Sequence, residues 1–246
     1  MLKADKSAAF QHLFDRYNRS YLLSRHFRSI AIKGQLDCGA LNSGRPIMYV
    51  MNHTSWWDGL LVYHAIRRQS AGDHYMMMEE EQLQKYRFFR RLGAFSINSQ
   101  SPGSLRSTLK YTEQLLSREG RVWIFPQGEM LPLESRPLEF RRGVGYLLER
   151  CPETVVIPVT LYHGLFLGMK PDAYMRVGTP VAEPWGHLGS SGSAQLLCTR
   201  LETELNLHKA EILEARGELP IGYALLLNKS RSTNEIYDEA RRRVGL

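Results

Sequence analysis

The stretch covering residues 47–59 constrains the possible fold more than any other part of the chain. Residues 47–51 (Ile-Met-Tyr-Val-Met) form an apolar run of strand length, which predicts a buried strand. Ser55 is followed three positions later by Asp58 and then by apolar residues, a pattern that predicts a capping box at the start of a helix. A buried strand that leads directly into a helix indicates an α/β protein and puts His53 in the turn between the two elements.

His53 and Asp58 are candidates for a catalytic pair. On a continuous helix, two side chains five positions apart point roughly 140° away from each other. With His53 in the turn and Asp58 in the first helical turn, the carboxylate can instead point back at the imidazole. A carboxylate on one ring nitrogen fixes the tautomer and leaves the other nitrogen free to accept a proton. The alternative is that Asp58 only caps its helix and His53 is a hydrogen-bonded turn histidine.

Strand-like and helix-like patterns alternate along the rest of the chain, which predicts a mixed or largely parallel sheet flanked by helices. The strands expected besides 47–51 are 30–36, 74–78, 93–97, 121–125, 154–161 and 174–177. The helices expected are 56–68, 79–91, 104–118, 143–150, 193–216 and a charged helix at 235–243. We expect a single α/β domain over residues 30–216, preceded by an N-terminal segment (1–29) and followed by a tail (217–246) with a short helix.

Residues 8–28 carry apolar or aromatic side chains at the spacing of one helical face, which predicts an amphipathic N-terminal helix. The side chains on this face are Phe10, Leu13, Phe14, Tyr17 and Tyr21. Such a face can lie in a membrane interface while neighbouring arginines reach lipid phosphates. It can also pack on the protein's own core, and different parts of the segment can do each.

Charge and cysteine usage limit the class of protein. The chain has 246 residues and a formal net charge of +7, which favours an anionic partner: nucleic acid, a membrane surface or a phosphorylated substrate. No motif of nucleic-acid binding is present, so that class is disfavoured. Cys38, Cys151 and Cys198 are widely spaced, which indicates neither a disulfide framework nor a metal site and suits a reducing compartment.

The chain has no signal-peptide pattern at its start and no apolar stretch of the ~20 residues needed to span a bilayer. We therefore expect a cytoplasmic protein that lies peripherally on the inner face of a membrane.

A second turn follows the strand expected at 121–125. Its sequence is Phe125-Pro126-Gln127-Gly128-Glu129, in which proline and glycine favour a tight turn. Glycine lets backbone amides approach a ligand closely, which suits an oxyanion that develops during a reaction. Turns of this composition are common and mostly structural, so this turn gains meaning only beside His53 and Asp58.

Together, the two turns resemble the motifs of the glycerolipid acyltransferase family, whose best-known members are the lysophosphatidic acid acyltransferases. The first motif, Asn-His-x-x-x-x-Asp, is matched by Asn52, His53 and Asp58. The third motif, Phe-Pro-Glu-Gly-Thr-Arg-Ser, is matched at Phe125, Pro126 and Gly128, and residues 155–159 are similar to the fourth. The resemblance covers roughly residues 30–180.

The resemblance implies transfer of a fatty acyl group from a coenzyme A or acyl-carrier-protein thioester to a hydroxyl of a lipid or glycolipid. His53 is then the general base and Asp58 orients it, with no bound cofactor and no metal. The residues expected to contact substrate are Asn52, Trp56, Phe125, Pro126, Gln127, Gly128, Glu129, Arg136, Arg141 and Arg142. Trp56 and Trp57 are candidates for an apolar wall that excludes water, although at least one of them is expected to pack in the core.

The sequence departs from the family where the acceptor's phosphate is held. Ser99 stands where the second motif has an arginine, Met130 stands where the third has one, and Gln127 replaces the glutamate. Without the two guanidiniums, the site lacks the bidentate hydrogen bonds that arginine makes to phosphate. Arg136, Arg141 and Arg142 are candidates to replace it or to bind the donor's phosphates; the alternative is a solvated basic face.

Four functions remain open from the sequence. The first is transfer to a phosphate-free lipid or glycolipid acceptor, and the second is an ordinary lysophosphatidic acid acyltransferase of phospholipid synthesis. The third is thioester hydrolysis, because only the exclusion of water separates hydrolysis from transfer. The fourth is a non-catalytic lipid-binding protein on a membrane surface.

Overall fold

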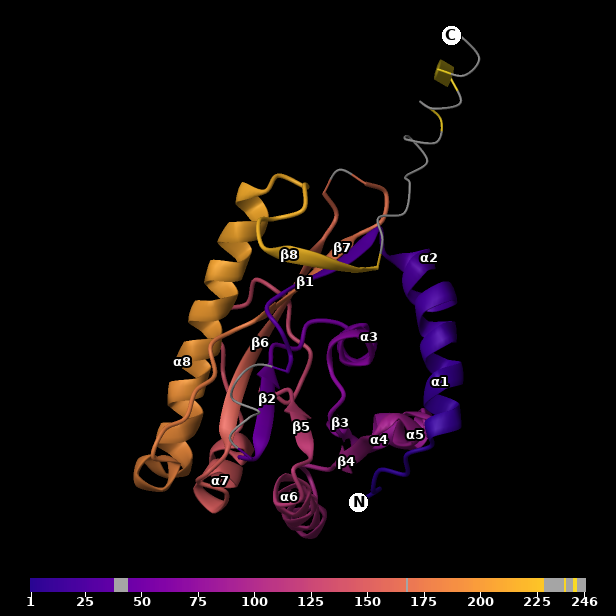
Figure 1. The fold of residues 1–246 in the computed structure, drawn as a ribbon. Coiled ribbons are helices and arrows are strands. Elements are labelled where there is room, and N and C mark those ends of the chain that lie inside the picture. Colours follow the sequence, from indigo (N-terminus) through magenta and orange to yellow (C-terminus); the bar gives the residue numbers. More distant parts are fainter. Residues whose placement is uncertain (38–43, 167, 228–236, 238–240, 243–246) are drawn as a thin grey trace.

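The computed structural model describes residues 1–37, 44–166, 168–227, 237 and 241–242. Within these residues, one eight-stranded sheet runs in the order β4-β3-β5-β2-β6-β7-β1-β8 (Figure 1). The strands are β1 (Ser29–Lys33), β2 (Ile47–Met51), β3 (His74–Glu79), β4 (Ala94–Ile97), β5 (Arg121–Ile124), β6 (Val155–Gly164), β7 (Asp172–Val177) and β8 (Tyr223–Leu227).

Helices cover both faces of this sheet (Figure 1). The helices are α1 (Ala8–Tyr17), the π-helical η1 (Asn18–Leu23), α2 (Ser24–His26), α3 (Asp58–Gln69), α4 (Glu80–Lys85), α5 (Phe89–Leu92), α6 (Pro102–Leu116), α7 (Gly143–Arg150) and α8 (Trp185–Glu214). The predicted α/β class, with a mixed sheet and an N-terminal helix, is confirmed.

Strand direction brings the two sequence motifs together. From β4 through β3, β5 and β2 to β6, every neighbouring pair is parallel, whereas β6 pairs with β7 and β1 with β8 in antiparallel fashion. The carboxyl ends of β2 and β5 therefore lie side by side at one edge of the sheet. The turn that holds His53 follows β2, and the turn over residues 125–129 follows β5, so both lie at this edge.

The uninterrupted apolar run of β2 is explained by burial on both faces. Tyr49 and Met51 pack into the cluster that includes α3, while Met48 and Val50 pack into the cluster formed with α6, α7 and α8. Tyr49 also stacks on Trp123 of β5 at a ring separation of 4.2 Å. A strand at the centre of a sheet covered on both sides has no solvent face, so its sequence shows no alternation.

The structure differs most clearly from the expected elements in three places. The helix expected at 79–91 is divided into α4 and α5, and α8 begins at Trp185 with a break at Gly189 (φ 65°), well before the expected start. Strand β8 was missed, because residues 223–227 give no alternating pattern. Most of the helix expected at 235–243, as well as Cys38, lies outside the described residues.

The N-terminal helix packs partly on the core. Phe14 is buried against Tyr63 of α3 and Phe88, at ring separations of 5.6 Å and 5.4 Å. In the neighbouring row of α1 and η1, Tyr17 and Tyr21 are 46% and 48% exposed. The aromatic pattern of the sequence therefore divides into a buried row and an exposed row.

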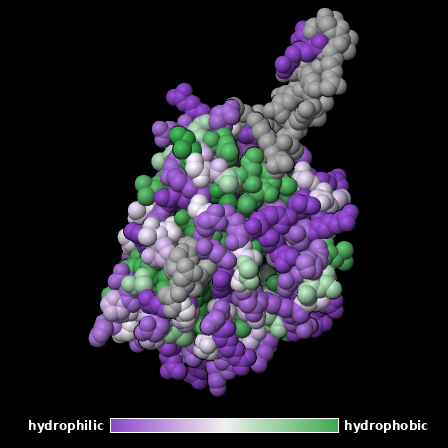
Figure 2. Space-filling model, in the orientation of Figure 1, coloured by the Kyte–Doolittle hydropathy of each residue, from purple (hydrophilic) through white to green (hydrophobic). Residues whose placement is uncertain are grey.

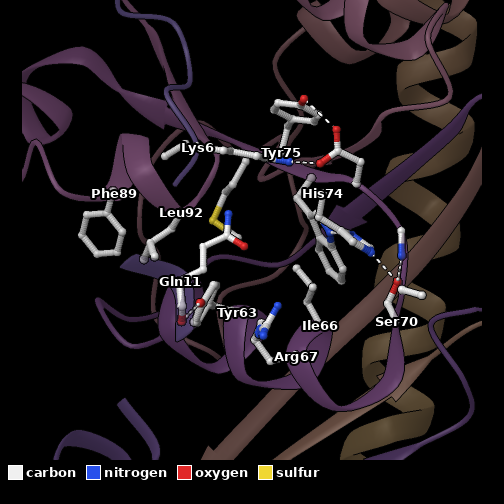
Figure 3. Close-up of a pocket in the computed structure, with 17 residues that line it drawn as sticks. Lys6, Gln11, Tyr63, Ile66, Arg67, Ser70, His74, Tyr75, Phe89 and Leu92 are labelled. Atoms are coloured by element: carbon white, nitrogen blue, oxygen red, sulfur yellow. Dashed lines mark hydrogen bonds and ion pairs between the residues drawn. The ribbon is translucent and has the colours of Figure 1, made fainter. Parts of the chain in front are cut away.

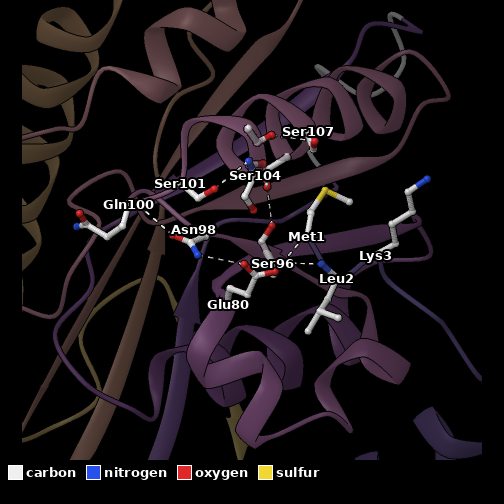
Figure 4. Close-up of polar contacts among 12 residues, drawn as sticks. Met1, Leu2, Lys3, Glu80, Ser96, Asn98, Gln100, Ser101, Ser104 and Ser107 are labelled. Atoms are coloured by element: carbon white, nitrogen blue, oxygen red, sulfur yellow. Dashed lines mark hydrogen bonds and ion pairs between the residues drawn. The ribbon is translucent and has the colours of Figure 1, made fainter.

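The first residues of the chain lie against the edge strand β4 (Figure 4). The N–H of Leu2 donates to Ser96 Oγ at 2.6 Å, and the N–H of Ser96 donates to the Leu2 carbonyl at 2.8 Å. The amino group of Met1 lies 3.1 Å from a carboxylate oxygen of Glu80, and this contact holds the pKa of Glu80 below its usual value. These contacts fix α1 relative to the sheet.

Gly145 offers a test of the contact between α7 and α8. A Cβ at Gly145 would overlap the carbonyl oxygen of Ser190, a backbone atom, so the two helices would have to separate. We expect Gly145→Ala to lower the free energy of unfolding by about 1–3 kcal/mol. Gly143→Ala is the matched control, because nothing lies within 4 Å of its added methyl group. Urea denaturation that ranks the two variants equally would contradict this packing.

Three buried histidines predict a loss of stability in acid. Burial lowers the pKa of His64 from 6.5 to about 4, and the pKa values of His74 and His208 from 6.5 to about 3. Since the folded-state pKa values lie below the unfolded ones, the unfolded chain takes up protons first as the pH falls. As the pH falls from 6.5 toward 3–4, the free energy of unfolding should decrease by about 1.4 kcal/mol per pH unit for each histidine. Urea denaturation across this range would measure the slope, and a flat profile would contradict it.

Candidate active site

His53 and Asp58 meet as the sequence predicts. His53 Nδ1 lies 2.8 Å from Asp58 Oδ2, and the carboxylate is completely buried while the imidazole side chain is 24% exposed. A carboxylate only accepts hydrogen bonds, so Nδ1 carries the proton and Nε2, on the far side of the ring, has a free lone pair. This is the tautomer that a general base requires.

Asp58 also organises the turn that carries His53. Its Oδ2 accepts the N–H groups of Thr54 at 2.7 Å and Ser55 at 3.0 Å, and its Oδ1 accepts the Ser55 hydroxyl at 2.8 Å. The acidic half of the predicted capping box is therefore present. In the other half, the Ser55 hydroxyl should accept the N–H of Asp58, but it accepts the N–H of Trp57 instead, at 3.2 Å. One carboxylate both closes the turn and orients the imidazole, so capping and orientation are the same set of contacts.

The turn after β5 holds His53 from one side. Gln127 is buried, and its Oε1 accepts the main-chain N–H of His53 at 2.7 Å. The main-chain carbonyl of His53 accepts the N–H of Leu131 at 3.0 Å. The imidazole stacks on the Phe125 ring at a centroid distance of 4.4 Å. Both main-chain polar groups and the ring of His53 are thus fixed by residues 125–131.

Strand β6 holds the same turn from the other side. The Asn52 side chain donates to the Leu161 carbonyl at 2.9 Å and accepts the Leu161 N–H at 2.8 Å. Two residues further along both segments, Thr54 Oγ1 lies 3.2 Å from His163 Nε2. Asn52 was expected to contact substrate, and the structure places its amide on the β6 backbone.

The turn at Gly128 has the conformation that glycine favours. Its φ is +76°, and its N–H donates to the Phe125 carbonyl at 3.1 Å, so this amide closes the turn. Arg141 donates its main-chain N–H to the Pro126 carbonyl at 2.7 Å, and a Cβ at Gly128 would lie 2.8 Å from Arg141 Nε. The Arg141 side chain therefore lies directly over the turn, beside exposed Glu129 at 3.8 Å.

The other two candidate arginines occupy different surroundings. Arg136 donates to the main-chain carbonyls of Leu133 and Ser135 and to Asn206 Oδ1 on α8. Arg142 is exposed at the start of α7. Of the three arginines singled out in the sequence, Arg141 is the one that the structure brings to the turn after β5.

Of the two neighbouring tryptophans, Trp56 lies at the surface and Trp57 packs against the core. Trp56 is 45% exposed and contacts Trp57 and Tyr86 edge-on at 5.6 Å and 6.2 Å. Trp57 packs against two core clusters and lies 5.4 Å from the Phe27 ring. Trp56 is therefore the one available to a ligand.

A cavity of about 170 Å³ lies between α3 and the sheet beneath it (Figure 3). Gly59, next to Asp58, lines it, as do Ile66, Met76 and Leu92 on its apolar part. Ser70, His74 and Lys6 lie around its polar part, where the Ser70 hydroxyl contacts His74 Nε2 at 2.6 Å. The cavity thus runs under α3 toward the start of β3, and Gly59 is its lining residue next to the candidate pair in the chain; neither His53 nor Asp58 lines it.

The described residues include neither a metal-binding cluster nor a membrane-spanning helix. No group of three His, Cys, Asp or Glu side chains among them is arranged to hold a metal ion. No helix among them is both long and apolar enough to cross a bilayer.

Comparison with known proteins gives a family match for the chain. A family model described as Acyltransferase matches residues 35–162, which include the turns that carry His53 and Gly128. No curated protein matches the chain. His163, which sequence reasoning missed, lies one residue beyond the matched segment; its place just after the strand expected at 154–161 was the available signal.

Gln127 offers a test of how the imidazole is held. Gln127→Met keeps the length of the side chain but removes the acceptor for the His53 N–H, so we expect a loss of about 1–3 kcal/mol in the free energy of unfolding. Gln127→Glu keeps an acceptor oxygen and is the matched control. Thermal or urea denaturation measures both, and equal stability of Gln127→Met and the wild type would contradict the assigned contact.

Proposed function

Because this chain belongs to the acyltransferase family, we propose that it transfers a fatty acyl group from a coenzyme A or acyl-carrier-protein thioester to a hydroxyl of a lipid or glycolipid. The proposal is carried by the contact between His53 Nδ1 and Asp58 Oδ2, with the far ring nitrogen turned away from the carboxylate. Membership of the family makes the chain an enzyme that transfers acyl groups. The roles of individual residues and the choice of substrates are part of the proposal.

In the proposed mechanism, His53 Nε2 removes the proton of the acceptor hydroxyl as its oxygen attacks the thioester carbonyl carbon. General-base assistance of this kind contributes about 10²–10⁴ in rate. Asp58 stabilises the imidazolium that forms, since its hydrogen-bonded carboxylate faces Nδ1. The tetrahedral intermediate then breaks its C–S bond, and the thiolate leaves and takes up the proton from His53. A thiolate whose conjugate acid has a pKa of about 8.5 needs little help to leave.

The surroundings of Arg141 support a phosphate-free acceptor. Ser99 and Met130 are both exposed and carry no charge at the two positions where the family has arginines. Arg141, which lies over the turn at Gly128, faces the carboxylate of Glu129. A carboxylate beside the guanidinium on this turn disfavours a dianionic phosphate there and suits hydroxyl groups.

The alternative acceptor is lysophosphatidate, as in phospholipid synthesis. Arg141 is then the residue to hold its phosphate, because it lies on the turn whereas Arg136 donates to α8 and to main-chain carbonyls.

The cavity under α3 is proposed to hold part of the donor's acyl chain, whichever acceptor is used. Its apolar walls at Ile66 and Met76 suit part of an acyl chain that enters beside Gly59.

We extend the proposal to a membrane surface as the place where the lipid acceptor is found. Leu13, Tyr17 and Tyr21 form an exposed row on α1 and η1, and the Arg25 guanidinium lies 4.8 Å from the Tyr21 ring. An aromatic row flanked by arginines suits the headgroup region of an anionic leaflet. Hydrophilic residues predominate on the surface in Figure 2, and hydrophobic ones gather mainly around β8. The row on α1 and η1 supports peripheral attachment on the inner membrane face.

Two phosphate-free acceptors and lysophosphatidate together test the proposal. Purified protein is incubated with palmitoyl-coenzyme A and either monooleoylglycerol, octyl glucoside or oleoyl lysophosphatidate, and the released thiol and acylated product are both measured. We expect product from the phosphate-free acceptors. His53→Ala should lower kcat by at least about 10², because the base is lost. Product from lysophosphatidate alone would reject the preferred acceptor in favour of the alternative.

The same assay separates the remaining functions. Thiol release that needs no acceptor and yields free fatty acid would identify a hydrolase. Equal thiol release by wild type and His53→Ala would remove the assigned role of the imidazole, and lipid binding without turnover would indicate a non-catalytic protein. His187→Ala, an exposed histidine on α8, is the control for loss of an imidazole elsewhere.

A further inference from the structure

A second histidine lies at the turn that carries the catalytic pair. His163 is near the end of β6, and its Nε2 lies 3.2 Å from Thr54 Oγ1. Thr54 directly follows His53 in the chain. Two main-chain N–H groups donate to Asp58 Oδ2, and the hydrogen bond from Thr54 (2.7 Å) is shorter than the one from Ser55 (3.0 Å). The contact from His163 through Thr54 therefore ends on the carboxylate that orients His53.

The strand geometry directs His163 toward this turn. Ile157, Val159 and Leu161 of β6 pack in the cluster that includes α3, and alternation along the strand puts His163 on the same side of the sheet. Residues 160 and 162 face the other side, where Thr160 contacts His208 and Tyr162 contacts Glu134. His163 is thus the β6 side chain beyond Leu161 that points to the side where Thr54 lies.

Few other contacts hold Thr54. Asn52 is held by two hydrogen bonds to Leu161, and His53 is held by Gln127 and Leu131. For Thr54, the contacts are the main-chain donation to Asp58 and the side-chain contact with His163. Among the described residues, the His163 imidazole is the hydrogen-bond partner of the Thr54 hydroxyl, so without it the main chain between His53 and Asp58 gains freedom.

From this arrangement we propose that His163 is a positioning residue for acyl transfer, which fixes Thr54 and thereby keeps Asp58 aligned on His53 Nδ1. The inference rests on the proposed function of His53, and it adds a residue that neither the family motifs nor the matched segment includes. A misplacement of a catalytic group by about 1 Å can cost 10² in rate, so a contact one step removed from the base has a measurable effect.

Three substitutions test the path through Thr54. His163→Phe keeps a ring of similar size and removes the hydrogen bond; His163→Gln keeps a polar group near the position of Nε2. Thr54→Val removes the hydroxyl and keeps the branched shape. We expect His163→Phe and Thr54→Val each to lower kcat about 10- to 100-fold with little change in KM for palmitoyl-coenzyme A. His163→Gln should recover most of the loss, and His187→Phe, on the exposed surface of α8, is the control.

The double variant decides whether His163 acts through Thr54. If it does, His163→Phe with Thr54→Val should be no slower than the worse single variant, because both remove the same contact. Multiplied effects, or a rise in KM with unchanged kcat, would overturn the proposal and indicate direct contact with substrate. Unchanged kcat in His163→Phe would overturn it as well, even if the melting temperature fell.

A measurement that needs no turnover separates this inference from the proposed function. Long-range proton–nitrogen correlation NMR of the histidine rings reports the tautomer of His53. We expect the Nδ1–H form in the wild type and in His163→Gln, and a mixture of tautomers in His163→Phe. If the wild-type protein transfers no acyl group but this pattern is found, the positioning role stands and the proposed reaction fails. If His53 keeps a single tautomer in His163→Phe, the positioning role fails.

Discussion

The site depends on one buried carboxylate. Asp58 accepts four hydrogen bonds, from the His53 ring, two main-chain N–H groups and a serine hydroxyl, and it has no exposure to solvent. Burying a charge is costly unless its oxygens are hydrogen-bonded, and these four donors offset that cost. The same contacts set the path of residues 53–55 and the orientation of the imidazole. Structure and chemistry therefore cannot be separated at this position.

The parallel part of the sheet explains why distant segments converge on His53. Parallel neighbours place their carboxyl ends at one edge, so the segments that follow β2 and β5 meet the carboxyl end of β6 there. Gln127 reaches the His53 main chain from one side, while Leu161 and His163 reach Asn52 and Thr54 from the other. A turn held on both sides loses little conformational entropy when substrate arrives, which favours catalysis by preorganisation.

The two halves of the site differ in how closely they keep the family pattern. The half that carries His53 and Asp58 is intact, whereas uncharged residues occupy both arginine positions on the acceptor side. Gln127 shows how one departure is accommodated, because its amide oxygen supplies an acceptor for the His53 N–H. That role needs an oxygen and no charge. The departures at Ser99 and Met130 remove both guanidiniums, and the proposed phosphate-free acceptor depends on them.

The sequence by itself determined the class of fold, the strand at 47–51, and the pairing of His53 with Asp58, because each depends on local patterns: apolar runs, capping signals and a motif of short spacing. Only the tertiary structure decided which arginine lies on the turn and that Asn52 bonds to the β6 backbone. It also decided that α1 presents one aromatic row to the core and one to solvent, and that His163 contacts Thr54. These depend on the order and direction of strands far apart in the chain. The pattern around a single residue does not encode which strand becomes its neighbour, and for that reason β8 and His163 were not foreseen.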